Sequence, residues 1–279
     1  MSYTIRKIIP KEIKLFMDWA EKEGWNPGLN DGRAFLFTDP AGFLVGELDG
    51  EIIAIKSAIR YGNEFGFMGF YIVKPEFRGK GYGYKLWWEG FNRVMNIPSG
   101  MDGVPEQQEN YIKSGYDFAY RQIRFEGKDI IPKASFNVQP VVEADLCNIL
   151  DYDKTIFPAS RAAFIKEWVM MPQSLTLKID EGVTIKGYGT IRKCVNGGFK
   201  IGPLFADNEV YAKQLFLSLI DFAEGNPVYI DTPEINHHAV ELAKAYGMKP
   251  VFETARMYHG GNPERRREKI YGVTSFELG

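Results

Sequence analysis

A glycine-rich turn between a strand and a helix carries the clearest chemical signal in this sequence. Residues 65–73 form a nearly continuous apolar run, which is typical of a strand buried on both faces. Pro75 ends this run because proline has no N–H to donate, and Gly79, Gly81 and Gly83 follow before a helical pattern begins. Unpaired N–H groups at a helix start attract anions, and glycines let a phosphate approach the backbone closely.

Two basic residues, Arg78 and Lys80, add positive charge to this turn. The turn does not satisfy the dinucleotide fingerprint, which needs a first strand near a domain start and an acidic residue about 20 positions later. The Walker phosphate loop is also absent, since the sequence contains no GKS or GKT. The pattern alone therefore leaves two interpretations open, an anion site and an ordinary flexible connection.

The segment from Val73 to Gly83 resembles the coenzyme A motif of the GCN5-related N-acetyltransferases (GNAT). That family places Arg or Gln, two residues, Gly, one residue and Gly or Ala after a V-x-P strand end, and this sequence matches every anchor. The resemblance implies that the turn binds the pyrophosphate of acetyl-coenzyme A (acetyl-CoA), a cosubstrate, with no metal. It also implies that the backbone of Tyr71, Ile72 and Val73 contacts the pantetheine and the thioester carbonyl. The turn residues expected to bind the cosubstrate are Arg78, Gly79, Lys80, Gly81, Tyr82, Gly83 and Tyr84.

The same resemblance assigns a catalytic role to Tyr111, in a short helix expected over residues 107–113. The family motif ends with Tyr, three residues, Gly and an aromatic residue, which Tyr111, Gly115 and Tyr116 match, whereas Val104 stands where the family has Asn. Tyr111 would protonate the leaving thiolate, because a phenol with a pKa near ~10 can share its proton with a thiol near ~8.5. The alternative is that Tyr111 is a packing aromatic.

Acetyl transfer also needs a stabilised oxyanion and a neutral amine. The resemblance implies that the backbone N–H of Ile72 or Val73 polarises the thioester carbonyl.

The motif does not identify a general base or the acceptor site. Glu64 and Asp102 lie near the ends of strands expected to flank the cleft, and Glu109 lies on the tyrosine helix. Each of these acids could equally be solvated. Trp25 and Asn26, in the loop after the first helix, are candidates for shaping the acceptor pocket, although Trp25 could equally belong to the core. The three histidines lack the arrangement of a metal site, so none is expected.

The expected elements repeat in two halves. Residues 1–128 give strand, helix, three strands, helix, strand, helix and strand, the order of the GNAT fold. A proline-containing linker, residues 127–140, precedes a second half with nearly the same order. We therefore expect an α/β (α+β) protein with two tandem GNAT-type domains, residues 1–128 and 137–279, each a mixed, mostly antiparallel twisted sheet flanked by helices.

The second half keeps the helix but loses the glycine turn. When the two helices are aligned on their apolar faces, Arg78 falls on Asp207 and Gly81 falls on Val210. A carboxylate repels pyrophosphate, and valine adds a Cβ where the backbone must be approached closely. We therefore expect a degenerate C-terminal domain that lacks the coenzyme A motif.

Composition limits the class of protein and its partners. Of 279 residues, 45% are hydrophobic and 25% charged, which is ordinary for a globular protein, and the net charge of −2 gives no reason to expect nucleic acid. No apolar run reaches the ~18 residues needed to span a bilayer, so no membrane association is expected. Two cysteines outside any CxxC arrangement, and no apolar leader, indicate a cytoplasmic protein.

Two functions follow from these residues. The first is an N-acetyltransferase that moves an acetyl group directly from acetyl-CoA to a primary amine of a small molecule or an exposed amino group. The second is a non-catalytic protein that binds or senses acyl-CoA. Tyr111 favours the first, and Val104 mildly favours the second. A further hypothesis has the second domain supplying the acceptor surface or a dimer contact, which makes a homodimer possible.

Overall fold

The computed structural model describes residues 2–132, 136–263 and 266–279. The elements of the N-terminal half are β1 (Tyr3–Lys7), α1 (Ile13–Lys22), α2 (Asp31–Thr38), β2 (Phe43–Leu48), β3 (Glu51–Tyr61), β4 (Phe65–Val73), α3 (Tyr82–Val94), β5 (Ser99–Gly103), α4 (Gln108–Lys113) and β6 (Asp117–Gly127). Those of the C-terminal half are β7 (Gln139–Pro140), α5 (Leu146–Lys154), α6 (Ala162–Val169), β8 (Ser174–Glu181), β9 (Thr184–Lys193), β10 (Phe199–Ala206), α7 (Glu209–Asp221), β11 (Val228–Pro233), α8 (His237–Ala245), β12 (Lys249–His259) and β13 (Ile270–Gly272).

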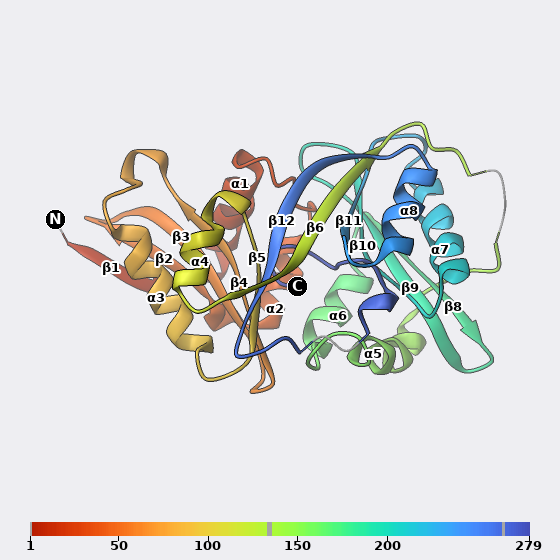
Figure 1. The fold of residues 1–279 in the computed structure, drawn as a ribbon, viewed down its shortest axis with the longest axis horizontal. Helices are drawn as coiled ribbons and strands as arrows, with labels where there is room; N and C mark the ends of the chain where they lie inside the picture. The colour runs from red at the N-terminus through yellow and green to blue at the C-terminus, as the bar shows by residue number, and fades with distance from the viewer. Residues whose placement is uncertain (1, 133–135, 264–265) are drawn as a thin grey trace.

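The strands of both halves form one sheet because the halves exchange their last long strands. Within the described residues the order is β1-β2-β3-β4-β5-β12-β6-β11-β10-β9-β8-β7, and β13 pairs with β10. Thus β12 pairs antiparallel with β5, while β6 lies between β12 and β11. Figure 1 shows β12 and β6 side by side across the middle of the molecule. The expected fold class is confirmed, with the difference that this exchange joins the two expected sheets into one.

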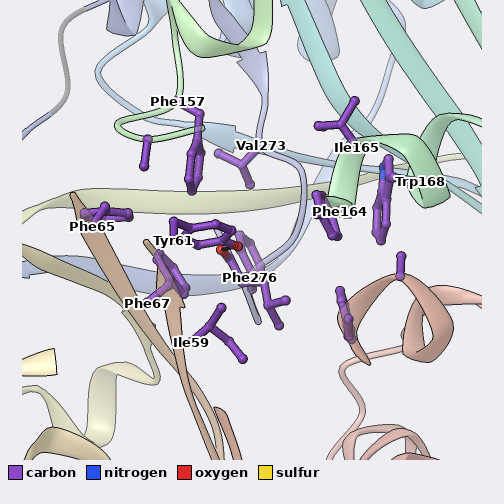
Figure 2. Close-up of a cluster of buried hydrophobic side chains, with 14 of the residues drawn as sticks. Ile59, Tyr61, Phe65, Phe67, Phe157, Phe164, Ile165, Trp168, Val273 and Phe276 are labelled. Carbon is purple, nitrogen blue, oxygen red and sulfur yellow. Dashed lines mark hydrogen bonds between the residues drawn. The ribbon is translucent and has the colours of Figure 1, made fainter. Parts of the chain in front are cut away.

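One hydrophobic cluster spans both halves. Figure 2 shows side chains from β3 and β4 gathered with side chains from α6 and from the last residues of the sequence. Phe35 of α2 stacks on Trp168 of α6, with ring centroids 6.0 Å apart. Burying a large apolar side chain stabilises a fold by about 1.5–3 kcal/mol, so this shared cluster couples the halves strongly.

In the N-terminal half, the parallel strands β4 and β5 pair over a short stretch and then separate. Their register ends at Met68, which lies opposite Met101, although β4 continues to Val73. A β-bulge interrupts the pairing of β4 with β3, and Phe70 in the bulge has a φ of 46°. Beyond Met68 the edge of β4 that faces β5 has no strand partner among the described residues, so its backbone groups remain available.

In the C-terminal half, the corresponding gap is filled by the chain itself. Strands β10 and β11 are also parallel, and their register ends at Ile201 opposite Ile230. Strand β13 pairs with the continuation of β10, and the N–H of Val273 donates to the carbonyl of Asp231 at 2.8 Å. The sequence pattern does not predict β13, because it is only three residues long.

Two helices differ from the expected pattern. Helix α2 is not predicted, since its sequence DGRAFLFT carries a glycine and lacks a regular apolar period. The sequence pattern also predicts a helix over residues 141–150, but the helix begins at Leu146. The N–H of Val141 donates to the carbonyl of Thr176 in β8, so the chain still lies beside β8 directly after β7.

Candidate active site

A cavity of about 500 Å³ lies where β4 and β5 separate. Its walls come from the glycine turn, the bulged part of β4, β5, α3, α4, β12 and the last residues of the sequence. The predicted cosubstrate residues that line it are Tyr71, Ile72, Val73, Arg78, Gly79, Gly81, Gly83 and Tyr84. Lys80 and Tyr82 are not among the lining residues, and the Lys80 ammonium lies 5.5 Å from the centre of the Phe77 ring.

The glycine turn adopts a backbone that other residues rarely adopt. Gly79 and Gly81 have φ values of 74° and 84°, in the left-handed region that favours glycine. Gly81 is the N-cap of α3, and no side chain caps this helix start. A Cβ at Gly83 would lie 2.7 Å from the Tyr71 hydroxyl oxygen and 2.8 Å from a methyl carbon of Val73, so a larger residue here would displace these side chains. The first N–H groups of α3 therefore remain available to an anion.

Arg78 is held at the mouth of the cavity. Its Nε donates to the carbonyl of Val73 at 2.8 Å, and its Nη2 donates to the Glu23 carboxylate at 2.6 Å. An incoming phosphate would therefore compete with Glu23 for the guanidinium.

The start of α7 in the C-terminal half is closed by its own side chains. The Asn208 side chain accepts from the N–H of Tyr211 at 3.0 Å, and Asp207 accepts from Lys269 at 2.6 Å. Val210 lies inside α7, whereas Gly81 precedes α3. In the structure Gly81 therefore does not correspond to Val210, so this alignment is wrong. When the two helices are aligned on their apolar faces, α7 begins earlier than α3.

Tyr111 of α4 is buried and lines the cavity. Its ring stacks on Trp87 of α3 with centroids 5.2 Å apart, and a Cβ at Gly103 would lie 2.4 Å from that ring. Within the described residues its hydroxyl makes no hydrogen bond, so the group is available to a molecule in the cavity.

Burial raises the pKa of Tyr111 well above its ordinary value. The sequence analysis compares the ordinary pKa of a phenol with that of a thiol, and these two values are close. In the folded protein the pKa of Tyr111 is higher, so the two values differ more. A thiol enclosed in the same cavity would also have a raised pKa, which narrows the difference again.

The sequence analysis gives no role to Lys56 of β3, although its side chain lines the cavity. The ammonium lies 4.3 Å from the centre of the Trp87 ring and 5.1 Å from that of Tyr71. A Cβ at Gly90 would lie 2.9 Å from the lysine Cε, which explains a glycine inside α3. No described residue forms a hydrogen bond or ion pair with the Lys56 ammonium, and burial lowers its pKa to about 7.

We expect the Lys56→Met variant to be more stable than the parent at and below pH 7. The folded-state pKa lies below the unfolded value, so the unfolded chain binds more protons between pH 7 and 10.5 and stability rises with pH there. The gap between 10.5 and about 7 sets an upper limit of roughly 5 kcal/mol, which the two aromatic rings reduce. Urea unfolding should show an advantage of about 2 kcal/mol at pH 6 that shrinks towards pH 10.

The matched control for this variant is Lys85→Met, on the exposed face of α3. It should leave the free energy of unfolding nearly unchanged at every pH. A Lys56→Met advantage that is independent of pH would show that packing, not charge, is the cause.

The predicted acceptor residues in the first loop reach the cavity only in part. Trp25 lines it, and its carbonyl accepts from Arg124 at 2.6 Å and from Lys200 at 3.2 Å. Asn26 is not a lining residue, and its side chain accepts from the N–H of Asn196 at 2.9 Å. The C-terminal half therefore fixes this loop in place.

The three candidate acids also differ in their positions. Asp102 lines the cavity, but its two oxygens accept from Arg256 of β12 at 2.8 and 2.7 Å. This ion pair holds β12 against β5. Glu64 lies in the exposed turn before β4, at the end away from the bulge, and Glu109 is exposed on α4; neither lines the cavity.

Four lining residues from the C-terminal half were not predicted at all: Phe252, Thr254, Phe276 and Glu277. No local motif marks them, because they reach the cavity through the exchanged strand β12 and the segment after β13.

Among the described residues no helix is long and apolar enough to cross a membrane, and no cluster of His, Cys, Asp and Glu is arranged to hold a metal.

Comparisons with known proteins agree with this geometry. Residues 11–97 match the acetyltransferase (GNAT) family, and residues 149–272 match an acetyltransferase (GNAT) domain. The chain therefore belongs to the GNAT acetyltransferases and carries two GNAT domains, and it is an acyltransferase. It is 32% identical to a protein from Pseudoalteromonas sp. (strain SANK 73390) named holothin acyltransferase, over 100% of this chain and 95% of that one.

Solved structures show the same fold. A putative acetyltransferase from Pyrococcus horikoshii matches with a TM-score of 0.85 at 21% identity, over 99% of this chain and 96% of that one. A tandem GNAT protein from the clavulanic acid biosynthesis pathway matches with a TM-score of 0.63 at 13% identity, over 94% of this chain and 100% of that one.

Proposed function

We propose that this protein transfers an acetyl group directly from acetyl-CoA to the primary amine of a small molecule, in the cavity of its N-terminal half. The observation that carries the proposal is one continuous cavity that joins the open start of α3, the unpaired edge of β4 and the hydroxyl of Tyr111. The pyrophosphate would bind the N–H groups around Gly81, and the pantetheine would lie along β4.

The cavity supports catalysis rather than binding alone. The bulge at Phe70 leaves backbone groups of β4 free to polarise a thioester carbonyl, and Tyr111 has a hydroxyl with no partner among the described residues. A protein that only sensed acyl-CoA would not need a proton donor at this position. The relative named holothin acyltransferase supports a small-molecule acceptor.

We expect acetyl-CoA to bind one site per chain. The N-terminal gap between parallel strands is open, whereas β13 fills the corresponding gap and Asn208 caps the corresponding helix. Titration calorimetry should give a stoichiometry of one, and ligand at ~100 Kd should raise the unfolding free energy by about 2.7 kcal/mol. Two sites per chain would contradict the proposal that the C-terminal half is degenerate.

Acetyl transfer itself is tested by following thiol release with a panel of acceptors. The panel should contain small aromatic and aliphatic amines, free amino acids, short peptides and holothin. We expect release that depends on one of the small amines and an acetylated product of matching mass. Release with peptides alone would contradict the small-molecule assignment.

A further inference from the structure

Residues of the C-terminal half form the cavity wall opposite Tyr111. Met68 of β4 packs in the cluster that contains Trp87 and Tyr111, and the next residue, Gly69, faces the opposite side of the sheet because strand side chains alternate. A Cβ at Gly69 would lie 2.2 Å from the carbonyl oxygen of Glu277. The segment after β13 therefore crosses β4 directly beside the bulge.

This segment is held firmly in that position. Residues 270–279 are buried, the Tyr61 hydroxyl donates to the carbonyl of Leu278 at 2.7 Å, and Val273 and Phe276 pack into the shared cluster of Figure 2. Glu277 is thus a fixed part of the cavity wall.

Among the described residues, none forms a hydrogen bond or an ion pair with the carboxylate of Glu277. The residue is only 4% exposed and it lines the cavity. Burying a carboxylate is costly, and the two oxygens of this one keep hydrogen-bonding capacity that a molecule in the cavity can use.

Other buried polar atoms on or beside the cavity wall have no hydrogen-bond partner within the described residues. They are the hydroxyl of Thr254, which lines the cavity, the hydroxyl of Ser57, which lies beside Gly69, and the side-chain amide of Gln122, which is paired in register with Thr254. An unsatisfied buried polar group costs about 1–3 kcal/mol, so ligand or ordered water is expected to satisfy them. Of these residues Thr254 lines the cavity, and together with Glu277 it defines a polar subsite.

We propose that Glu277 is the general base of the acetyl transfer and that it receives the amine of a small acceptor in this subsite. The aromatic side chains of Trp25, Phe252 and Phe276 line the same cavity, and they suit a flat apolar acceptor body. Because about 500 Å³ must hold both the pantetheine arm and the acceptor, the acceptor is a small molecule. This inference rests on the proposed function.

Glu277 takes one proton from the acceptor ammonium and passes it to water. The neutral amine attacks the thioester carbonyl, so a C–N bond forms and the C–S bond breaks. Tyr111, on the opposite face, gives its proton to the thiolate and regains one from the nitrogen, and the products are the amide and the free thiol.

Charged groups from four elements face Glu277. Burial raises the pKa of its carboxyl, Lys200 and the guanidiniums of Arg124 and Arg192 act against this rise, and Asp31 adds to it. A raised pKa suits a carboxylate that must take a proton from an amine near neutral pH. Activity should therefore fall on the acidic side as Glu277 becomes protonated.

The test is the Glu277→Gln variant, assayed with an amine that the parent acetylates. At pH 7 we expect kcat/KM to fall by about 10- to 100-fold, since water can replace the base in part. The loss should shrink as the pH approaches the pKa of the amine, because solution then supplies neutral amine. Acetyl-CoA affinity, measured by calorimetry, should stay unchanged and serves as the check on folding.

Two further variants sharpen this test. Glu277→Asp keeps the carboxylate and should recover part of the activity, whereas Glu253→Gln, which removes an exposed carboxylate on β12, should change nothing. Suppose that the parent acetylates an amine, and that Glu277→Gln keeps kcat/KM within about threefold and shows the same fall in kcat/KM at acidic pH. The assignment of Glu277 as the base is then overturned. If the parent acetylates no amine, the proposed function fails instead, and the assignment fails with it.

Discussion

The Tyr111→Phe variant is expected to lose about 10²–10⁴-fold in kcat while keeping its affinity for acetyl-CoA. The phenol is proposed to give its proton to the thiolate, which carries charge only as the C–S bond breaks. Its removal should therefore affect the transition state and leave the ground state unchanged. Burial raises the pKa of Tyr111, so the phenol stays protonated at neutral pH. Its ionisation should therefore cause no loss of activity on the alkaline side of the pH–rate profile near neutral pH.

The packing of the variant should be preserved. Phenylalanine keeps the ring that stacks on Trp87, and the lost hydroxyl has no partner among the described residues. The melting temperature should hardly change. Steady-state kinetics with the best acceptor, together with calorimetry for acetyl-CoA, measures both quantities.

The matched control is Tyr116→Phe in the same aromatic cluster. The Tyr116 hydroxyl is hydrogen-bonded to Ser99 at 2.8 Å and does not line the cavity, so this variant should lose stability and keep kcat. If Tyr111→Phe instead lowers stability and leaves kcat intact, Tyr111 is a core aromatic, and the proton donor must be sought elsewhere.

Sequence reasoning predicts the proposed cosubstrate side of the site because its signals are local. The turn at Gly79 to Gly83 combines a strand end, left-handed glycines and a helix start within a few residues, and each leaves a trace in residue type. The short helix with Tyr111 is marked in the same way. These elements occur where the sequence pattern predicts them.

The proposed acceptor side could not be predicted in this way, because it depends on contacts between distant segments. Glu277 lies beside Gly69 only because β12 and β6 are exchanged and because β13 directs the following residues across the sheet. Asp102, a candidate base in the sequence, is neutralised by Arg256, which is 154 positions away. A single sequence carries no record of such pairs.

The burial of Lys56 is a second feature that the sequence pattern does not predict. A lysine within an apolar strand predicts a break in burial, yet its side chain is 1% exposed and lies against two aromatic rings. Gly90, on α3, provides the space that makes this possible. Residue type alone cannot show that a glycine on one element compensates for a long side chain on another.

The Gly81→Val variant is expected to bind acetyl-CoA at least about 100-fold more weakly than the parent. Gly81 has a φ of 84°, and a β-branched residue in the left-handed region costs roughly 1–2 kcal/mol or more, so the backbone should rearrange. The N–H groups that start α3 would then turn away from the phosphate. Hydrogen bonds to charged groups contribute about 1.5–3 kcal/mol each, so losing one or two accounts for the expected change.

The control for this variant separates backbone strain from the loss of the anion site. Gly50, in the turn between β2 and β3, has a φ of 89°, and no atom lies within 4 Å of its added Cβ, as at Gly81. Gly50→Val should therefore cost similar stability and leave acetyl-CoA affinity unchanged. Equal affinity losses in the two variants would mean that strain acts globally. Parent-like affinity in Gly81→Val, measured by calorimetry, would mean that the pyrophosphate does not bind at this turn.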